Sequence, residues 1–275
     1  MLNWPPKLPL LIKREMADGV LKTLIVGSGF MGTSIALALA ESERMRLLRL
    51  NPNDQESDDI ISCVEQNLDY LEPLRSLYIY KKLYRSINEV DEDFDLIIIC
   101  SRQKEALDHI INFSKKFPSA VITDISSSKE FLIDKNLPRN FISSHPICGS
   151  HKTGPEDAYH SLFLDKEVIL IKGAEQELID SMKQFWEFLG ARTTELNLDE
   201  HNRIYAYLSH FPHYLSFIYR EILEESNIDF NKYSGDSLKE ILRLSDSDKN
   251  LWDEIFSDNK SNIDSLKEKI KKKLS

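Results

Sequence analysis

Hydrophobic positions in the first 172 residues alternate between short apolar runs and longer stretches of helical composition. Residues 30–41 and 103–117 have the composition of helices, and residues 54–85 are also predicted to be mostly helical. The short apolar runs predict β-strands over residues 22–26, 46–50, 96–100, 120–123, 140–143 and 167–172. Because strands and helices alternate, the pattern predicts an α/β fold with an open, doubly wound parallel sheet.

The pattern changes after about residue 172. Apolar side chains recur at helical spacing from there on, and helices are predicted over residues 175–189, 199–226, 237–243, 248–256 and 261–274. The helices carry apolar residues on more than one side, which indicates a second partner surface. We therefore expect an N-terminal extension (1–21), a dinucleotide-binding domain (22–173) and an all-helical domain (174–275).

A glycine-rich segment directly follows the first predicted strand and opens an apolar helix. Residues 27–32 read G-x-G-x-x-G. The first glycine permits a tight turn, the second lets the backbone approach a pyrophosphate, and the third allows close packing of helix on strand. The helix N-terminus attracts the phosphates. The segment predicts a Rossmann-like cofactor site, and the expected cofactor-binding residues are Gly27, Gly29, Phe30, Met31, Gly32, Arg49 and Ser101.

The choice between NAD and NADP depends on the end of the second predicted strand. An acid there would accept hydrogen bonds from the adenosine ribose of NAD, but the first acid after that strand is Asp54. Arg49 stands where the acid is expected, and a guanidinium can pair with a 2′-phosphate. We therefore expect NADP. The alternative is that Arg49 is an ordinary surface residue and that NAD binds without the carboxylate.

Composition excludes several classes of protein. The 275 residues include 45 acids and 35 bases, for a net charge of −10, which argues against a nucleic-acid-binding surface. The three cysteines are far apart and predict no disulfide framework, as is typical of a reducing cytosol. No apolar run approaches the roughly 20 residues that span a bilayer. The first 20 residues do not resemble a signal peptide, so a cytoplasmic protein without membrane contact is expected.

Four further segments carry polar residues at informative positions. They read DISSSK (124–129), SHPICG (144–149), SHFPH (209–213) and RLSDSDKNLW (243–252). The first two follow predicted strands, which places them at the carboxyl edge of the sheet, where a nicotinamide ring would lie. The third belongs to the longest predicted helix, which Pro212 is expected to kink.

Together with the glycine segment, these motifs resemble the prephenate/arogenate dehydrogenase (TyrA) family. That family shows D-x-x-S-x-K, H-P-[MI]-x-G followed by K-[ST]-G, S-H-[LF]-P-H and R-x-x-x-S-D-x-x-x-W, in the order found here. The resemblance implies oxidative decarboxylation of a small-molecule substrate, prephenate or arogenate, with a nicotinamide cofactor. It also implies a homodimer formed through the helical domain.

The resemblance assigns roles to individual residues. His145 matches the catalytic base, and imidazole suits that task because its ordinary pKa lies near 6.5. Ser127 matches a serine that hydrogen-bonds near this histidine, although Ser126 and Ser128 leave the register open by one. Arg243 matches the arginine that grips a substrate carboxylate. The remaining substrate-binding residues implied are Ser209, His210, His213 and His151.

Other interpretations remain open at this point. His145 could simply end a strand, and His201 could be a packing histidine. His210 and His213 have the spacing of metal ligands, but no third ligand with suitable spacing accompanies them, so no metal is expected. His151 replaces a glutamate found in many relatives that use prephenate, which leaves the substrate open. The other functions considered are a β-hydroxyacid dehydrogenase and a non-catalytic NADP-binding regulator.

Overall fold

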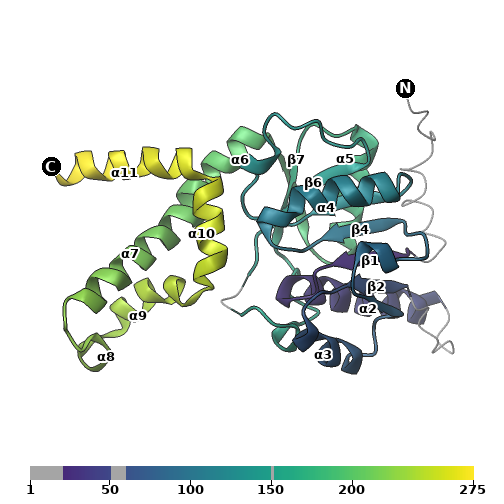
Figure 1. Cartoon of the computed structure of the whole chain (residues 1–275), viewed down its shortest axis with the longest axis horizontal. Helices are drawn as coiled ribbons and strands as arrows, with labels where there is room; N and C mark the ends of the chain where they lie inside the picture. The colour runs from purple at the N-terminus through teal and green to yellow at the C-terminus, as the bar shows by residue number, and fades with distance from the viewer. Residues whose placement is uncertain (1–20, 51–59, 150–151) are drawn as a thin grey trace. The chain divides into compact units, whose positions relative to one another are not determined.

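An eight-stranded sheet organises the first part of the chain, in the order β3-β2-β1-β4-β5-β6-β7-β8 (Figure 1). The computed structural model describes residues 21–50, 60–149 and 152–275. The strands are β1 (Thr23–Val26), β2 (Ile61–Val64), β3 (Lys82–Tyr84), β4 (Leu96–Ile99), β5 (Val121–Asp124), β6 (Phe141–Pro146), β7 (Glu167–Ile171) and β8 (Arg192–Leu196). Neighbouring strands are parallel except β6 and β7, which are antiparallel. The predicted doubly wound sheet is confirmed.

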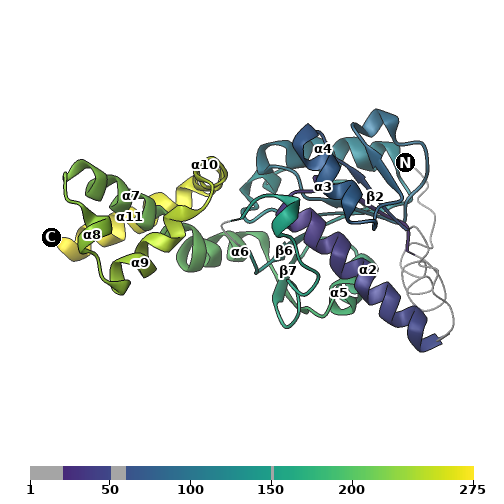
Figure 2. The same cartoon turned by 90° about the horizontal axis from the view of Figure 1, so that it is seen from below.

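Helices cover both faces of this sheet. The α-helices are α2 (Phe30–Leu50), α3 (Leu71–Ser76), α4 (Gln103–Lys116) and α5 (Gln176–Phe188), with short 3₁₀ turns η1 (Leu68–Tyr70), η2 (Ile87–Glu89), η3 (Glu130–Leu132) and η4 (Pro155–Asp157). Figure 2 shows α2 and α5 on one side and α4 on the other. Crossovers between parallel strands are right-handed, so the direction in which the chain moves across the sheet decides which face a helix covers. The chain moves one way from β1 to β2 through α2 and the other way from β4 to β5 through α4, so α2 and α4 lie on opposite faces. Because β7 runs opposite to β6, the helix that follows β7, α5, lies on the face of α2. β1 and β4 are therefore covered on both faces and are buried at every position.

Three sequence-based assignments are corrected. Residues 46–50, predicted to be the second strand, belong to α2, and the second strand is β2. Residues 54–85, predicted to be mostly helical, contain β2 and β3. The domain boundary placed after residue 173 moves to Asn197, because α5 packs on the sheet and is followed by β8, an unpredicted strand that pairs with β7.

Among the described residues, a second compact unit consists of Ser127–Asp134, Lys152 and Leu198–Ser275. Its helices are α6 (Leu198–Tyr205), α7 (Phe211–Glu225), α8 (Phe230–Tyr233), α9 (Asp236–Leu242), α10 (Lys249–Asp258) and α11 (Lys260–Leu274). A π-helical turn, η5 (Ala206–His210), joins α6 to α7, and a 3₁₀ turn, η6 (Arg243–Asp246), follows α9. The π-turn lies next to Pro212, which cannot donate a main-chain hydrogen bond, so the helix adjusts locally there. The prediction of an all-helical second domain is confirmed.

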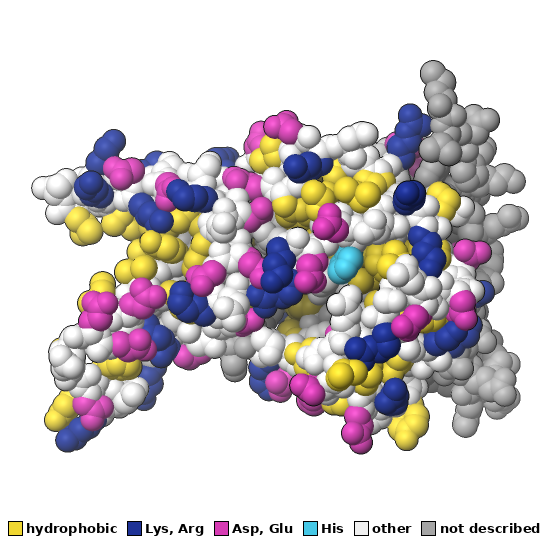
Figure 3. All heavy atoms as spheres, in the orientation of Figure 1, with side chains coloured by type: hydrophobic (Ala, Val, Ile, Leu, Met, Phe, Trp, Pro, Cys, Tyr) yellow, Lys and Arg dark blue, Asp and Glu magenta, His cyan; other side chains and the backbone are white. Residues whose placement is uncertain are grey.

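The core of the second unit is small. One cluster is centred on Phe211 and Ile263, and another on Phe217, Trp252 and Ile255. Figure 3 shows hydrophobic side chains gathered between α7 and α11 on the face in view. Several large apolar residues of this unit stay exposed: Leu208, Leu215, Tyr219, Ile222 and Ile241. Within the described residues, no helix has the length and apolar character needed to cross a membrane.

Candidate active site

The glycine loop between β1 and α2 has the tight packing that a dinucleotide site requires. Gly27 has a φ of +91°, and a Cβ there would lie 3.0 Å from the backbone of Cys100 and Ser101. A Cβ on Gly32 would lie 2.1 Å from the carbonyl oxygen of Gly27, so any side chain would push α2 away from β1. The first and third glycines therefore serve the tight turn and the close packing of helix on strand that a dinucleotide-binding loop has.

The amide of Phe30 begins α2, where phosphate oxygens would be expected to bind. In the structure this amide donates a hydrogen bond to the Thr153 carbonyl at 2.9 Å. A pyrophosphate at this helix N-terminus would compete with that carbonyl for the same donor. The Thr153 backbone must therefore shift if a bound cofactor is to use the Phe30 amide.

An acidic residue, Glu65, directly follows β2 beside the glycine loop. Its carboxylate is buried and accepts hydrogen bonds from the amides of Ser28 and Asn67, each at 2.7 Å. A carboxylate at the end of the second strand of such a domain is the group that binds the adenosine ribose hydroxyls. The sequence analysis missed Glu65 because it placed the second strand at residues 46–50.

Arg49 does not occupy the position from which NADP was expected. It lies in α2, whereas the residue after the second strand is Glu65. The prediction that Arg49 ends the second strand is therefore wrong, and the argument for NADP that depended on it no longer stands. The side chain of Arg49 and the whole of His151 lie outside the described residues.

Ser101 follows β4, next to the glycine loop. Its hydroxyl forms a hydrogen bond with Nδ1 of His109 on α4 at 2.8 Å. Burial lowers the pKa of His109, against a smaller opposing effect of Glu105 and Asp108. A neutral imidazole therefore anchors the Ser101 side chain at the carboxyl edge of the sheet.

His145 lies near the end of β6 and is 6% exposed. The hydroxyl of its neighbour Ser144 accepts a hydrogen bond from the Trp186 indole N–H at 3.1 Å and forms another with the Thr123 hydroxyl at 2.9 Å. Because successive side chains in a strand point to opposite faces, His145 faces away from this buried anchor. Ser143, on the same face of β6 as His145, donates a hydrogen bond to Asp124 at 2.6 Å. The backbone of His145 is thus held by buried side chains on both faces of the strand.

The serine turn after β5 belongs to the helical unit from Ser127 onward. Asp258, at the end of α10, accepts hydrogen bonds from the Ser128 hydroxyl and, at 3.1 Å, from the Glu130 amide. The Lys129 amide donates to Oδ1 of Asn202 on α6 at 3.1 Å. Side chains of α6 and α10 therefore hold the turn through hydrogen bonds.

These contacts bear on which serine of the turn can meet a substrate. Ser128 is fully buried and its hydroxyl is engaged by Asp258. Ser127 is only partly buried. The Ser126 main-chain amide donates a hydrogen bond to the Asp124 carboxylate at 3.0 Å, which stabilises the turn. Ser126 and Ser127 are both partly buried, so only Ser128 is set apart, and the register that selects Ser127 stays a prediction.

His213, Trp252 and Arg243 form a group on the helical unit. The rings of His213 and Trp252 are stacked, with centroids 3.5 Å apart and planes 16° from parallel. Nδ1 of His213 lies 2.9 Å from the Ser209 carbonyl, which can only accept, so Nδ1 carries the proton and Nε2 is the acceptor. Burial lowers the pKa of His213, and the Arg243 charge lowers it further. The group therefore combines a neutral imidazole with a cation.

Arg243 is the exposed cation of this group. No carboxylate among the described residues forms an ion pair with it within 4.0 Å. A guanidinium with this freedom can bind a carboxylate with two parallel hydrogen bonds. His210, by contrast, is fully buried, and burial lowers its pKa to about 3. The structure therefore brings His213 and Arg243 together but places His210 beneath the surface.

The fold and these residues define a class: a Rossmann-type dinucleotide-binding protein with a separate helical domain. Two family models match the chain, one described as the nucleotide-binding domain of prephenate dehydrogenase over residues 55–195 and one as its dimerization domain over residues 197–275. The chain belongs to the prephenate dehydrogenase family.

Individual relatives agree with this assignment. A prephenate dehydrogenase of Bacillus subtilis is 24% identical over 273 residues, covering 90% of this chain and 66% of the relative. A cyclohexadienyl dehydrogenase of Zymomonas mobilis is 29% identical over 149 residues, covering 50% of this chain and 51% of the relative. This chain therefore spans between half and two-thirds of the length of these curated relatives.

A solved structure matches nearly the whole chain. The prephenate dehydrogenase of Aquifex aeolicus, in complex with hydroxyphenyl propionate and NAD⁺, is 27% identical with a TM-score of 0.79. The match covers 93% of this chain and 88% of that one. The fold of both units is thus that of a known dehydrogenase.

Proposed function

We propose that this protein is a prephenate dehydrogenase, which converts prephenate to 4-hydroxyphenylpyruvate and CO₂ with a nicotinamide cofactor. The observation that carries the proposal is the group formed by Arg243, His213 and Trp252. An exposed cation beside stacked rings suits a substrate that combines a flat carbon ring with carboxylates. The glycine loop and Glu65 fit the cofactor, and the named relatives favour this substrate class.

The chemistry requires few groups from the protein. When bound, the nicotinamide cofactor accepts the hydride that leaves C4 of prephenate. His145 accepts the proton of the C4 hydroxyl, and Ser127 orients that hydroxyl. Arg243 holds a substrate carboxylate. Loss of CO₂ from C1 makes the ring aromatic and supplies most of the driving force, so the protein has mainly to position the substrate and remove one proton.

For the cofactor we propose a preference for NAD. Glu65 stands where a carboxylate would accept hydrogen bonds from both ribose hydroxyls. A 2′-phosphate at the same place would add about two negative charges next to a buried carboxylate. The Glu65 carboxylate is held in that place by hydrogen bonds from the main-chain amides of Ser28 and Asn67.

The test of this function is the absorbance of reduced cofactor at 340 nm. Purified protein is assayed with prephenate, arogenate and a β-hydroxyacid, each with NAD and with NADP. The proposal predicts turnover with prephenate and NAD above the other five combinations. Turnover with arogenate alone would identify the tyrosine-forming member of the family instead. Turnover with the hydroxyacid alone, or with none, would refute the proposal.

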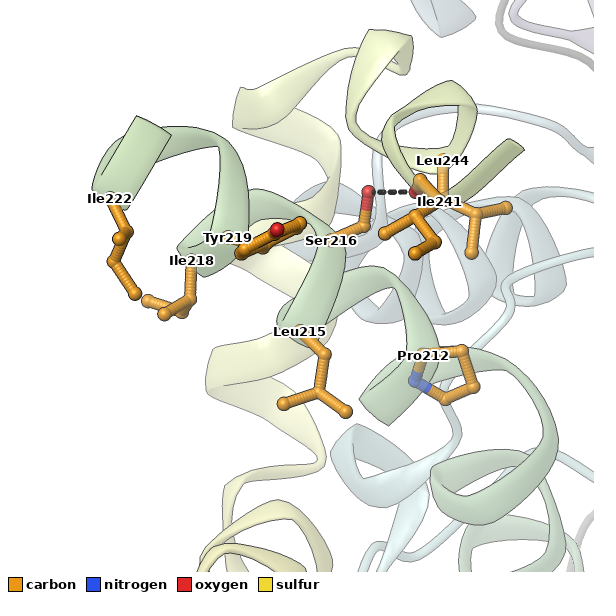
Figure 4. A pocket seen from close by; sticks show the side chains of 8 residues that line it. All are labelled: Pro212, Leu215, Ser216, Ile218, Tyr219, Ile222, Ile241 and Leu244. Carbon is orange, nitrogen blue, oxygen red and sulfur yellow. Dashed lines mark hydrogen bonds between the residues drawn. The ribbon is translucent and has the colours of Figure 1, made fainter. Parts of the chain in front are cut away.

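We also propose a homodimer formed through the helical unit. An apolar groove lies between α7 and α9, lined by Pro212, Leu215, Ser216, Ile218, Tyr219, Ile222, Ile241 and Leu244 (Figure 4). The Ser216 hydroxyl, one of the lining groups, donates a hydrogen bond to the Ile241 carbonyl at 2.6 Å. The matching family model is described as a dimerization domain, so a second copy of this chain is the expected occupant.

For the location we propose the cytoplasm. Cys63, Cys100 and Cys148 are all free thiols in the structure. Burial raises the pKa of Cys63 and of Cys148 to about 12, which keeps both protonated and unreactive. Unpaired thiols are typical of proteins from reducing compartments.

A further inference from the structure

The last residue before α11, Asn259, lies at the centre of a buried polar cluster in the helical unit. It is fully buried. Its amide nitrogen Nδ2 lies 2.8 Å from the Asn202 carbonyl oxygen and 3.0 Å from Nδ1 of His210. Its oxygen Oδ1 lies 2.8 Å from the amide nitrogen of Asn262. All the hydrogen-bonding groups of this side chain are therefore used.

The orientation of the Asn259 amide follows from its partners. A main-chain carbonyl can only accept a hydrogen bond, so the group that faces Asn202 must be the NH₂. The reversed amide would place its oxygen against the Asn202 oxygen, with no donor between them. The same NH₂ therefore faces His210, and Nδ1 of that ring must be the acceptor.

The proton of His210 is fixed as a result. Burial is the main cause that lowers the pKa of the ring to about 3, with His201 and His213 contributing in the same direction, so the ring is neutral at physiological pH. Because Nδ1 accepts from Asn259, the single proton lies on Nε2. The Nε2 atom is buried and has no hydrogen-bond partner of standard geometry among the described residues. The Ser127 backbone nevertheless lies close enough to raise the ring's pKa.

We propose that Asn259 is a positioning residue that sets the tautomer of His210. The Nε2–H is thereby kept as a donor toward the backbone of the serine turn. It steadies Ser127 in the arrangement that the substrate meets. This role rests on the proposed function, in which Ser127 orients the substrate hydroxyl. A merely space-filling role for Asn259 would not require either ring nitrogen to carry the proton.

The substitution Asn259→Asp tests this with almost no change of shape. Its carboxylate would face Nδ1 of His210 and repel that lone pair, so the ring must place a proton on Nδ1. The surrounding titratable groups are His201 on α6 and His213 on α7, with Lys129 beside His201. The new carboxylate should therefore raise the pKa of His210. The matched control is Asn250→Asp, which makes the same change at an exposed position of α10.

The direct measurement is the ¹⁵N spectrum of the histidine rings in the intact protein, with the His210 signals assigned by their loss in His210→Gln. The proposal predicts a neutral ring with the proton on Nε2 in the wild type and in Asn250→Asp, and a protonated Nδ1 in Asn259→Asp. A wild-type ring with its proton on Nδ1 would overturn the proposal. That wild-type spectrum decides the question even if Asn259→Asp fails to fold.

Kinetics distinguishes positioning from packing. In Asn259→Asp the imidazolium keeps its Nε2–H at low pH, but the neutral Nδ1–H form at higher pH loses it. We expect kcat/KM for prephenate to fall by about tenfold on the alkaline side, which gives a bell-shaped profile. The wild-type profile should only rise with pH. A uniform loss at all pH values would contradict the positioning role. Failure of the wild type to turn over prephenate would refute the proposed function without changing the spectrum.

Discussion

At the scale of single residues, the reaction depends on the imidazole of His145 accepting a proton. Replacing it in His145→Asn keeps a polar side chain of similar size but removes the base. We expect kcat to fall by about 10²–10⁴-fold, the usual range for a positioned acid–base group, with cofactor binding retained. Stopped assays at 340 nm and cofactor fluorescence titration measure the two effects. Activity within a few-fold of the wild type would remove His145 from this role.

Arg243 should act in substrate binding rather than in the chemical step. In Arg243→Ala the carboxylate loses a paired contact that exists already in the ground state, so KM should rise far more than kcat falls. A loss on the order of 2–5 kcal/mol would raise KM by roughly 30-fold or more. Arg203→Ala is a suitable control, because that arginine is exposed on α6 of the same unit. An unchanged KM would show that another group holds the carboxylate.

At the scale of elements, the residue that follows β2 determines the choice of cofactor. Glu65→Ser removes the carboxylate from the ribose position. The ratio of kcat/KM for NAD to that for NADP should fall by at least about tenfold, or about 1.4 kcal/mol. The ratio is the appropriate measurement, because loss of the Glu65 hydrogen bonds to Ser28 and Asn67 would weaken both cofactors alike. A wild type that prefers NADP would contradict the assignment.

The elements that were predicted from the sequence are those with the strongest local signal. β4 is a continuous apolar run. In the segment between β1 and α2, a Cβ at any of the three motif glycines would crowd nearby backbone atoms, so glycine is needed at each of these positions. β2 was missed because residues 46–50 have a strand-like apolar composition, although they continue α2. β8 was missed because it is an edge strand with a polar, partly exposed sequence, RTTEL.

Candidate site residues could be predicted from the sequence only where they belong to a recognisable local motif. His145, Ser127, Arg243 and His213 were all proposed as site residues from local sequence patterns. The supporting residues Asp258 and Asn259 were not, because each acts across more than 45 residues of chain, on Ser128 and on His210 respectively. Such pairings depend on how α10 packs against the rest of its unit, which local patterns do not encode.

At the scale of the whole molecule, the helical unit should bring two copies together. Ile241 is half exposed on α9 at the groove, so Ile241→Asp would place a charge in the proposed interface. Sedimentation should give about twice the chain mass of 31.9 kDa for the wild type and a lower mass for the variant. Leu68→Asp, at an exposed apolar residue beside β2, should leave the mass unchanged. A wild type of single-chain mass at micromolar concentration would refute the dimer.

The central claim is that hydride transfer is coupled to loss of CO₂ from the substrate ring. The most direct measurement follows both products in one reaction with prephenate and NAD: NADH by its absorbance at 340 nm and CO₂ from a labelled ring carboxylate. The account predicts equal amounts of NADH and CO₂, with 4-hydroxyphenylpyruvate as the organic product. NADH formed without CO₂, or CO₂ released without NADH, would contradict it.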